Sequence, residues 1–252
     1  MKKVNLILSL LIVLLSLSSC ARKQYIIKSA DGYVIEMNNR FDNNADPKML
    51  SIVDMYKAKL DTEMNEVIGE AAQTITKSGT QSFLAAFTAD AMYEYITKTY
   101  GAVDLTLINN GGLRTILNKG PVTIGNMYEI FAFENGIVVL ELQGKHLKQL
   151  FDAFTKKTIE GFPKNVRLTL KNNKVELLTI NGRPLDESAT YKIVTVDYLA
   201  EGNGGMEALK NATKYTDLNM TLRDMMINYV KKLTAENKKI YAETDNRLEI
   251  KE

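Results

Sequence analysis

The chain has 252 residues, of which 45% are hydrophobic and 25% are charged, and its formal net charge is +2. This length suits one large domain with its own core. Cysteine and histidine each occur once, which excludes a disulfide within the chain and a thiolate metal cluster. The small net charge gives no global field to attract nucleic acid, so we predict no nucleic-acid partner.

The N-terminus has the pattern of a secretory signal peptide. Lys2 and Lys3 precede an apolar run over residues 4–17, which is short for a membrane span, and small residues then lead to Cys20. This ending resembles the bacterial lipobox, in which the cysteine is lipidated and becomes the mature N-terminus. We expect residues 1–19 to be a lipoprotein signal peptide and Cys20 to carry acyl chains that hold the protein at a membrane. The alternatives are an ordinary signal peptide and a buried first helix.

Residues 20–45 are expected to form a tether with a small hairpin. Apolar runs over 25–27 and 33–35 flank Asp31-Gly32, a pair typical of tight turns. Ala21 and Arg22 follow the cysteine, so no acidic residue stands there to retain the protein at an inner membrane. We therefore predict a lipid-anchored protein of the cell envelope, with the outer membrane, facing the periplasm, as the favoured site.

Helices and strands alternate over residues 46–252. Asp46 and Pro47 predict a helix start, as the N-cap and the first helical residue, and the apolar stripe that follows gives this helix one apolar face. Further helices are expected over about 82–98, over 147–154 and after Thr221, where a capping box is indicated.

Strands are expected over 66–74, 103–108, 137–142, 166–170, 174–180 and 191–196. Two of them, 166–170 and 174–180, form a predicted hairpin across Asn172-Asn173. A hairpin inside an alternating pattern predicts an α/β fold with mixed sheets flanked by helices.

Three separate stretches place glycines, aromatic rings or an Arg/Asn pair beside the ends of predicted strands. They are residues 109–114 (NNGGLR), 131–135 (FAFEN) and 197–205 (DYLAEGNGG). Open α/β proteins hold ligands at such strand ends. We therefore predict that the three stretches form one binding site.

The first stretch has the clearest chemistry. Gly111 and Gly112 let the backbone turn sharply and approach a ligand closely. Arg114 offers a forked donor that suits phosphate, and Asn109 can donate to and accept from a base edge. The alternative is a glycine turn with a surface arginine.

In their order and spacing, the three stretches resemble the C-terminal, substrate-binding domain of the 5'-nucleotidase family, over roughly residues 46–250. The resemblance implies that Asn109 meets the base and Arg114 the phosphate. It also implies that Phe133 and Tyr198 form the two sides of an aromatic slot for the base, and Asn135 matches an asparagine of the family pattern. For Phe133 the alternative is ordinary core packing.

The chain departs from the family pattern at four positions. Ala132 and Glu134 replace a proline and a glycine, so the turn that carries Phe133 is less rigid. Gly204 stands where the family has an aspartate that holds the ribose hydroxyls, and Thr80 lies where the family has a phosphate-binding arginine. Hydrogen bonds to charged groups contribute roughly 1.5–3 kcal/mol each. Two such losses would weaken nucleotide binding by about two to four orders of magnitude.

Complete nucleotidases of this family carry a second domain with two catalytic metal ions. This chain has one histidine, His146, which we expect on the surface, and it has no Ser-His-Asp set, P-loop or dinucleotide fingerprint. We therefore predict no catalytic residues, metal site or cofactor in this chain, and divalent metals on a separate metallophosphoesterase chain. The alternatives are a nucleoside-binding lipoprotein without catalysis and a domain kept for protein contacts.

Overall fold

The computed structural model describes residues 27–36, 38–40, 45–78, 82–154, 159–243 and 245–251. The chain divides into two units, residues 1–51 and 52–252, and the division falls within helix α2 (Pro47–Met64). The predicted signal peptide, Cys20 and Thr80 lie outside the described residues. No helix in the described ranges is both long and apolar enough to cross a bilayer.

The described part of the first unit shows no hairpin at the predicted place, and residues 25 and 26 of the first predicted arm lie outside the described residues. Residues 27–36, which include the second arm, contain no strand, and Tyr33 and Val34 are almost fully exposed. An isolated two-stranded hairpin is marginal in water without a face to pack on, so this prediction was wrong. Asp46 caps α2 as predicted, because its Oδ1 accepts hydrogen bonds from the backbone N–H groups of Lys48 (2.8 Å) and Met49 (3.2 Å).

Helix α2 confirms the helix that the apolar stripe predicts. Its apolar face is exposed: none of its residues is buried, and Val53, Tyr56 and Leu60 are more than half exposed. The helical period of the stripe predicts the helix and does not predict what covers it.

The central sheet of the second unit is mixed, with the strand order β2-β8-β4-β9. Strand β8 runs parallel to β2 and antiparallel to β4, which pairs antiparallel with β9. The bounds are β2 (Leu105–Thr106), β8 (Thr190–Val196), β4 (Gly136–Gln143) and β9 (Lys214–Thr221). The two candidate stretches at 131–135 and 197–205 flank the adjacent ends of β4 and β8, where Ile137 pairs with Val196.

A second four-stranded sheet has the order β10-β5-β6-β7. The predicted hairpin of β5 and β6 is confirmed, and Asn172 and Asn173 turn with φ of 51° and 56°, as a two-residue hairpin turn requires. Strand β10 adds to β5 in parallel, so this sheet is mixed as well. The bounds are β10 (Leu248–Lys251), β5 (Val166–Lys171), β6 (Lys174–Ile180) and β7 (Arg183–Pro184), and a separate pair consists of β1 (Val67–Ala71) and β3 (Gly120–Thr123).

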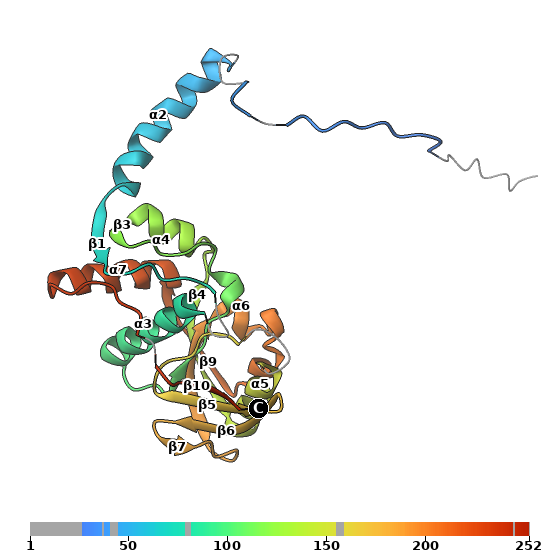
Figure 1. Cartoon of the computed structure of the whole chain (residues 1–252), viewed down its shortest axis with the longest axis vertical. Helices are drawn as coiled ribbons and strands as arrows, with labels where there is room; N and C mark the ends of the chain where they lie inside the picture. Colours follow the sequence, from blue (N-terminus) through green and yellow to red (C-terminus); the bar gives the residue numbers. More distant parts are fainter. Residues whose placement is uncertain are drawn as a thin grey trace, which may run out of the picture. The chain divides into compact units, whose positions relative to one another are not determined.

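Helices flank these sheets, which confirms the predicted α/β class. Their bounds are α3 (Phe83–Tyr100), α4 (Ile124–Ile130), α5 (Gly144–Phe154), α6 (Asp197–Ala200) and α7 (Leu222–Ala235). Helix α7 packs against α3, α4 and β1 (Figure 1). Thr221 caps it by accepting a hydrogen bond from the Asp224 N–H at 3.0 Å, as predicted.

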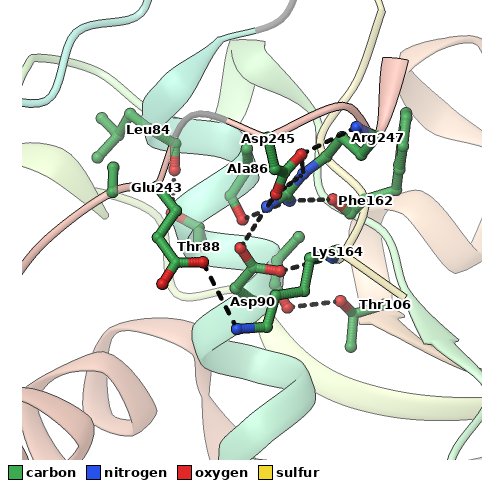
Figure 2. A network of polar contacts seen from close by, with 12 residues as sticks. Leu84, Ala86, Thr88, Asp90, Thr106, Phe162, Lys164, Glu243, Asp245 and Arg247 are labelled. Carbon is green, nitrogen blue, oxygen red and sulfur yellow. Dashed lines mark hydrogen bonds and ion pairs between the residues drawn. The ribbon is translucent and has the colours of Figure 1, made fainter. Parts of the chain in front are cut away.

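A buried ion network joins α3 to the C-terminal segment (Figure 2). The Arg247 side chain is 2% exposed, and its guanidinium donates to Asp90 (2.6 Å), to Asp245 (2.5 Å) and to the carbonyl of Phe162 (2.7 Å). Burial raises the pKa of Asp90, although Arg247 acts in the opposite direction. Because each charge here has a partner, the network holds the fold together, and loss of one member would leave a buried charge unpaired.

Candidate functional site

The stretch at 109–114 is held in place mainly by residues 159–161. Ile108 bridges to Gly161, and residues Asn110–Gly112 form one short 3-10 turn. The Asn110 N–H donates to Glu160 Oε2 at 2.6 Å, and the Asn110 side chain donates to the carbonyl of Ile159 at 3.0 Å. These bonds fix the loop to the segment at 159–161.

Asn109 is a buried side chain that lacks a partner. It is 9% exposed, and within the described part of the chain its Oδ1 accepts no hydrogen bond. A Cβ at position 112 would lie 2.9 Å from that oxygen, so Gly112 makes room for it. An unsatisfied buried acceptor costs about 1–3 kcal/mol.

The three stretches form a single cavity of about 310 Å³. A volume of this order is near the lower end for small-molecule sites and suits a compact ring compound. Every site residue predicted from the sequence lines it, namely Asn109, Gly111, Gly112, Arg114, Phe133, Asn135 and Tyr198. The structure therefore brings the predicted set together, while the role of each residue in binding stays a prediction.

Both aromatic rings of the cavity are accessible. Phe133 is 48% exposed and Tyr198 is 45% exposed. The alternative that Phe133 is an ordinary core residue was wrong. Half-exposed rings that share a cavity provide flat apolar faces on which a ring compound can stack.

Arg114 supplies the positive charge of the cavity. Its backbone N–H donates to the Ile130 carbonyl at 2.9 Å, and its guanidinium reaches the Gly111 carbonyl at 3.4 Å. A guanidinium has five N–H donors, so this single long bond does not exhaust them. The side chain therefore suits an anion that enters beside Phe133.

Position 204 faces the same site. A Cβ on Gly204 would lie 3.6 Å from Asn109 Nδ2 and 4.0 Å from the Tyr198 ring, and the glycine has φ of +67°. The neighbouring carboxylate of Asp197 is engaged elsewhere, because its Oδ1 accepts from the Tyr198 N–H at 2.7 Å. The residues that line the cavity thus include no carboxylate.

Two cations near the site were missed in the sequence. The Lys77 ammonium donates to the carbonyl of Leu113, next to Arg114. Arg223, at the start of α7, donates to the carbonyl of Phe131 at 3.1 Å and to the Glu134 carboxylate. Lys77 directly precedes the segment in which the family pattern has its arginine, so its position in the sequence could have indicated a cation near the site. Nothing in the local sequence indicates that Arg223 lies there.

A larger cavity, of about 710 Å³, lies among α3, α7 and residues 238–243. Its principal carboxylate, Glu94, accepts from Lys98 (2.7 Å), Lys232 (3.2 Å) and the Tyr229 hydroxyl (3.1 Å). Burial raises the pKa of Glu94, but these hydrogen bonds outweigh burial and lower it to about 2. Because Glu94 is already paired with its own neighbours, the smaller cavity is kept as the candidate site.

No metal-binding cluster is found in the described parts of the chain, where no group of three or more His, Cys, Asp or Glu side chains could hold an ion. His146 is part-exposed, and its Nδ1 lies 3.1 Å from Gln149 Oε1. The predicted surface position of His146 is therefore confirmed, and the hydrogen bond occupies one of its ring nitrogens.

Comparison with known proteins agrees with the arrangement of the cavity. The family model for the 5'-nucleotidase, C-terminal domain matches residues 67–211, more than half of the chain. The chain belongs to this family. The matched residues contain all three stretches of the site, and the mixed α/β fold is that of the 5'-nucleotidase C-terminal domain.

Members and relatives of this family are longer proteins. The chain is 27% identical over 217 residues to an apyrase of Tabanus yao and 28% identical over 243 residues to the NAD 5'-nucleotidase of Haemophilus influenzae. These matches cover 73% and 79% of this chain but only 39% and 40% of the relatives. The 5'-nucleotidase precursor of Thermus thermophilus has a similar fold, with a TM-score of 0.70 and 24% identity over 80% of this chain and 42% of that one.

Proposed function

We propose that this chain is the substrate-binding half of a nucleotide-hydrolysing pair. The observation that carries the proposal is the single cavity in which Phe133, Tyr198 and Arg114 meet. In this account the base stacks on the two rings and Arg114 binds the phosphate. Base stacking on an aromatic side chain contributes about 1–3 kcal/mol per base, so the rings provide much of the affinity.

Asn109 and Asn135 provide the polar contacts in this proposal. The Asn109 side chain lines the cavity, and its amide can hydrogen-bond a polar edge of the base. Lys77, held beside Leu113, adds positive charge to the loop that carries Arg114 and offsets part of the loss of an arginine in the segment around Thr80. In this proposal, this chain binds and orients the nucleotide.

Hydrolysis requires a second chain in this proposal. The described residues hold no cluster of metal ligands, and the chain spans about two fifths of the relatives' length. A separate exported metallophosphoesterase would supply divalent metal ions, which activate water and stabilise the charge on the phosphoryl oxygens. The nucleotide bound at Arg114 would present its phosphate to that chain.

The test is phosphate release from AMP by the mature chain, an exported metallophosphoesterase of the same organism and Mg²⁺ or Mn²⁺. We expect release by the mixture to exceed the sum of the two chains alone, and Arg114→Met to reduce the gain. If the mixture releases no more phosphate than the phosphoesterase alone, the paired function is wrong.

A nucleoside-binding lipoprotein without catalysis is the second candidate. The loss of the family's phosphate-binding arginine, in the segment around Thr80, favours it, because the phosphate is the group that distinguishes a nucleotide from a nucleoside. Equal affinity for adenosine and AMP by calorimetry would support this candidate over the first. Either function takes place at a membrane surface if Cys20 is lipidated. Partition of the wild-type chain into detergent, and its loss in Cys20→Ala, would test that anchor.

A further inference from the structure

The loop that presents Phe133 is held at both sides by the start of α7. The Arg223 guanidinium donates to the carbonyl of Phe131 at 3.1 Å and forms an ion pair with the carboxylate of Glu134. The backbone N–H of Leu222 donates to the carbonyl of Asn135 at 2.9 Å. Three of the five residues of the loop are thus bound to two consecutive residues of one helix.

Burial of the Arg223 side chain at this contact costs free energy of hydration. Its side chain is 6% exposed, and a buried guanidinium must recover the hydration that it loses. The Tyr128 ring covers it, with the guanidinium carbon 4.1 Å from the ring centroid, and this geometry is favourable for a cation and an aromatic face. Arg223 thus lies between the Tyr128 ring of α4 and the loop at 131–135. Through these contacts it fixes the position of the loop relative to α4 and α7.

Phe133 itself has little packing to fix its direction. The residue on its N-terminal side is Ala132, and its own ring is about half exposed. Ala132 does not restrict the backbone as a proline does. The carboxylate of Glu134, the next residue, is 74% exposed and yet is directed to Arg223.

We propose that Arg223 and Glu134 form a latch that sets the direction of the Phe133 ring. Arg223 is a positioning residue in this account, and Glu134 is its partner. The effect on nucleotide binding rests on the proposed function, whereas the effect on the ring does not.

The ring can be observed directly, because the chain contains no tryptophan. Phe133→Trp gives a single tryptophan at the position in question, and it can be excited selectively over the 12 tyrosines. In this background we compare Glu134→Gln, which removes the charge but keeps the shape, with Arg223→Met. Glu129→Gln, on the exposed surface of α4, is the matched control.

We expect acrylamide quenching of the tryptophan to rise about twofold in Glu134→Gln and in Arg223→Met, as a held ring becomes free to exchange rotamers. Quenching in Glu129→Gln should equal that of the parent. Salt at 1 M should raise quenching in the parent and leave Glu134→Gln unchanged, because salt screens an exposed pair. Unchanged quenching in Glu134→Gln with no salt response in the parent would overturn the latch, whether or not Arg223→Met folds.

Adenosine affinity, measured without the reporter substitution, separates this inference from the function. Glu134→Gln should bind about two- to fivefold more weakly, the range of a mostly exposed ion pair. Increased quenching with no adenosine binding by the wild-type chain supports the latch and contradicts the function. Adenosine binding with unchanged quenching in the variants supports the function and contradicts the latch.

Discussion

The guanidinium carbon of Arg114 lies 5.7 Å from the centroid of the Phe133 ring. The charge and the ring come from different loops, one after β2 and one before β4, and they meet in the cavity. At this distance a cation and an aromatic face attract each other by about 0.5–1 kcal/mol at an exposed site. The contact keeps the guanidinium of Arg114 beside the Phe133 ring, as the proposed binding of phosphate and base by these two groups requires.

The contribution of Tyr198 to adenosine affinity should come from its ring and not from its hydroxyl. We expect Tyr198→Phe to bind adenosine as the wild type does, and Tyr198→Ala to lose about 1–3 kcal/mol, or roughly 5- to 150-fold in affinity. Calorimetry measures both. Tyr215→Ala, at an exposed tyrosine of β9 outside the cavity, is the control and should bind normally. A loss in Tyr198→Phe as large as that in Tyr198→Ala would contradict stacking.

Arg114 should distinguish a nucleotide from a nucleoside. Arg114→Met removes the charge-assisted hydrogen bonds to phosphate, so AMP affinity should fall roughly 10- to 150-fold while adenosine affinity changes little. Arg183→Met, at an exposed arginine of β7, should change neither. Equal losses for the two ligands would show that the guanidinium supports the ring and not the phosphate.

With Gly204 in place of an aspartate, the affinity of the site should depend little on the ribose hydroxyls of the ligand. The residues that line the cavity provide no carboxylate for ribose hydroxyls, so adenosine and 2',3'-dideoxyadenosine should bind the wild type with similar affinity. Gly204→Asp should favour adenosine by about tenfold, since aspartate tolerates positive φ and would face the site. Competition binding measures the ratio.

The control for that change is Gly204→Asn, which has nearly the same shape without the charge. Leu199 must move slightly in either variant, because a new Cβ would lie 3.2 Å from its side chain. If Gly204→Asp and Gly204→Asn favour adenosine over 2',3'-dideoxyadenosine equally, the negative charge of the aspartate does not contribute to recognition of the ribose hydroxyls. A wild-type chain that already prefers adenosine strongly would contradict the prediction.

Stability should fall with acid partly through Glu94. Its pKa is about 2 in the folded chain, below the ordinary value of 4.5, so its contribution is present above pH 4.5 and is lost as the pH falls from 4.5 towards 2. The side chain is 38% exposed, so the contribution is at most about 1 kcal/mol. Urea unfolding at several pH values should show a flatter acid dependence in Glu94→Gln and an unaltered one in Glu129→Gln. An acid dependence of Glu94→Gln as steep as that of the wild type would contradict this assignment.

The candidate site could be predicted because its chemistry is local in sequence. Asn109, the two glycines and Arg114 lie within six consecutive positions, next to the end of a predicted strand. The roles of Phe133 and Tyr198 were predicted from the resemblance of the three stretches to the family pattern. Glu134 appeared in the sequence only as a departure from a pattern, because its partner Arg223 comes from a distant segment.

Long-range features account for most of what the sequence did not reveal. Strand β9 is mostly exposed and polar, and it becomes a strand because β4 offers it an edge. Arg247 had the appearance of an ordinary surface arginine, although its side chain is 2% exposed and paired with two aspartates. The apolar stripe of α2 predicted its helix but not its exposure.

The most direct test of the account is calorimetric titration of AMP into the wild-type chain and into Phe133→Ala. We predict saturable one-site binding by the wild type and a loss of at least about fivefold in affinity for the variant, as removal of one stacking ring requires. No binding by the wild type, or the same affinity in Phe133→Ala with its fold intact, would contradict the assignment of this cavity to a nucleotide.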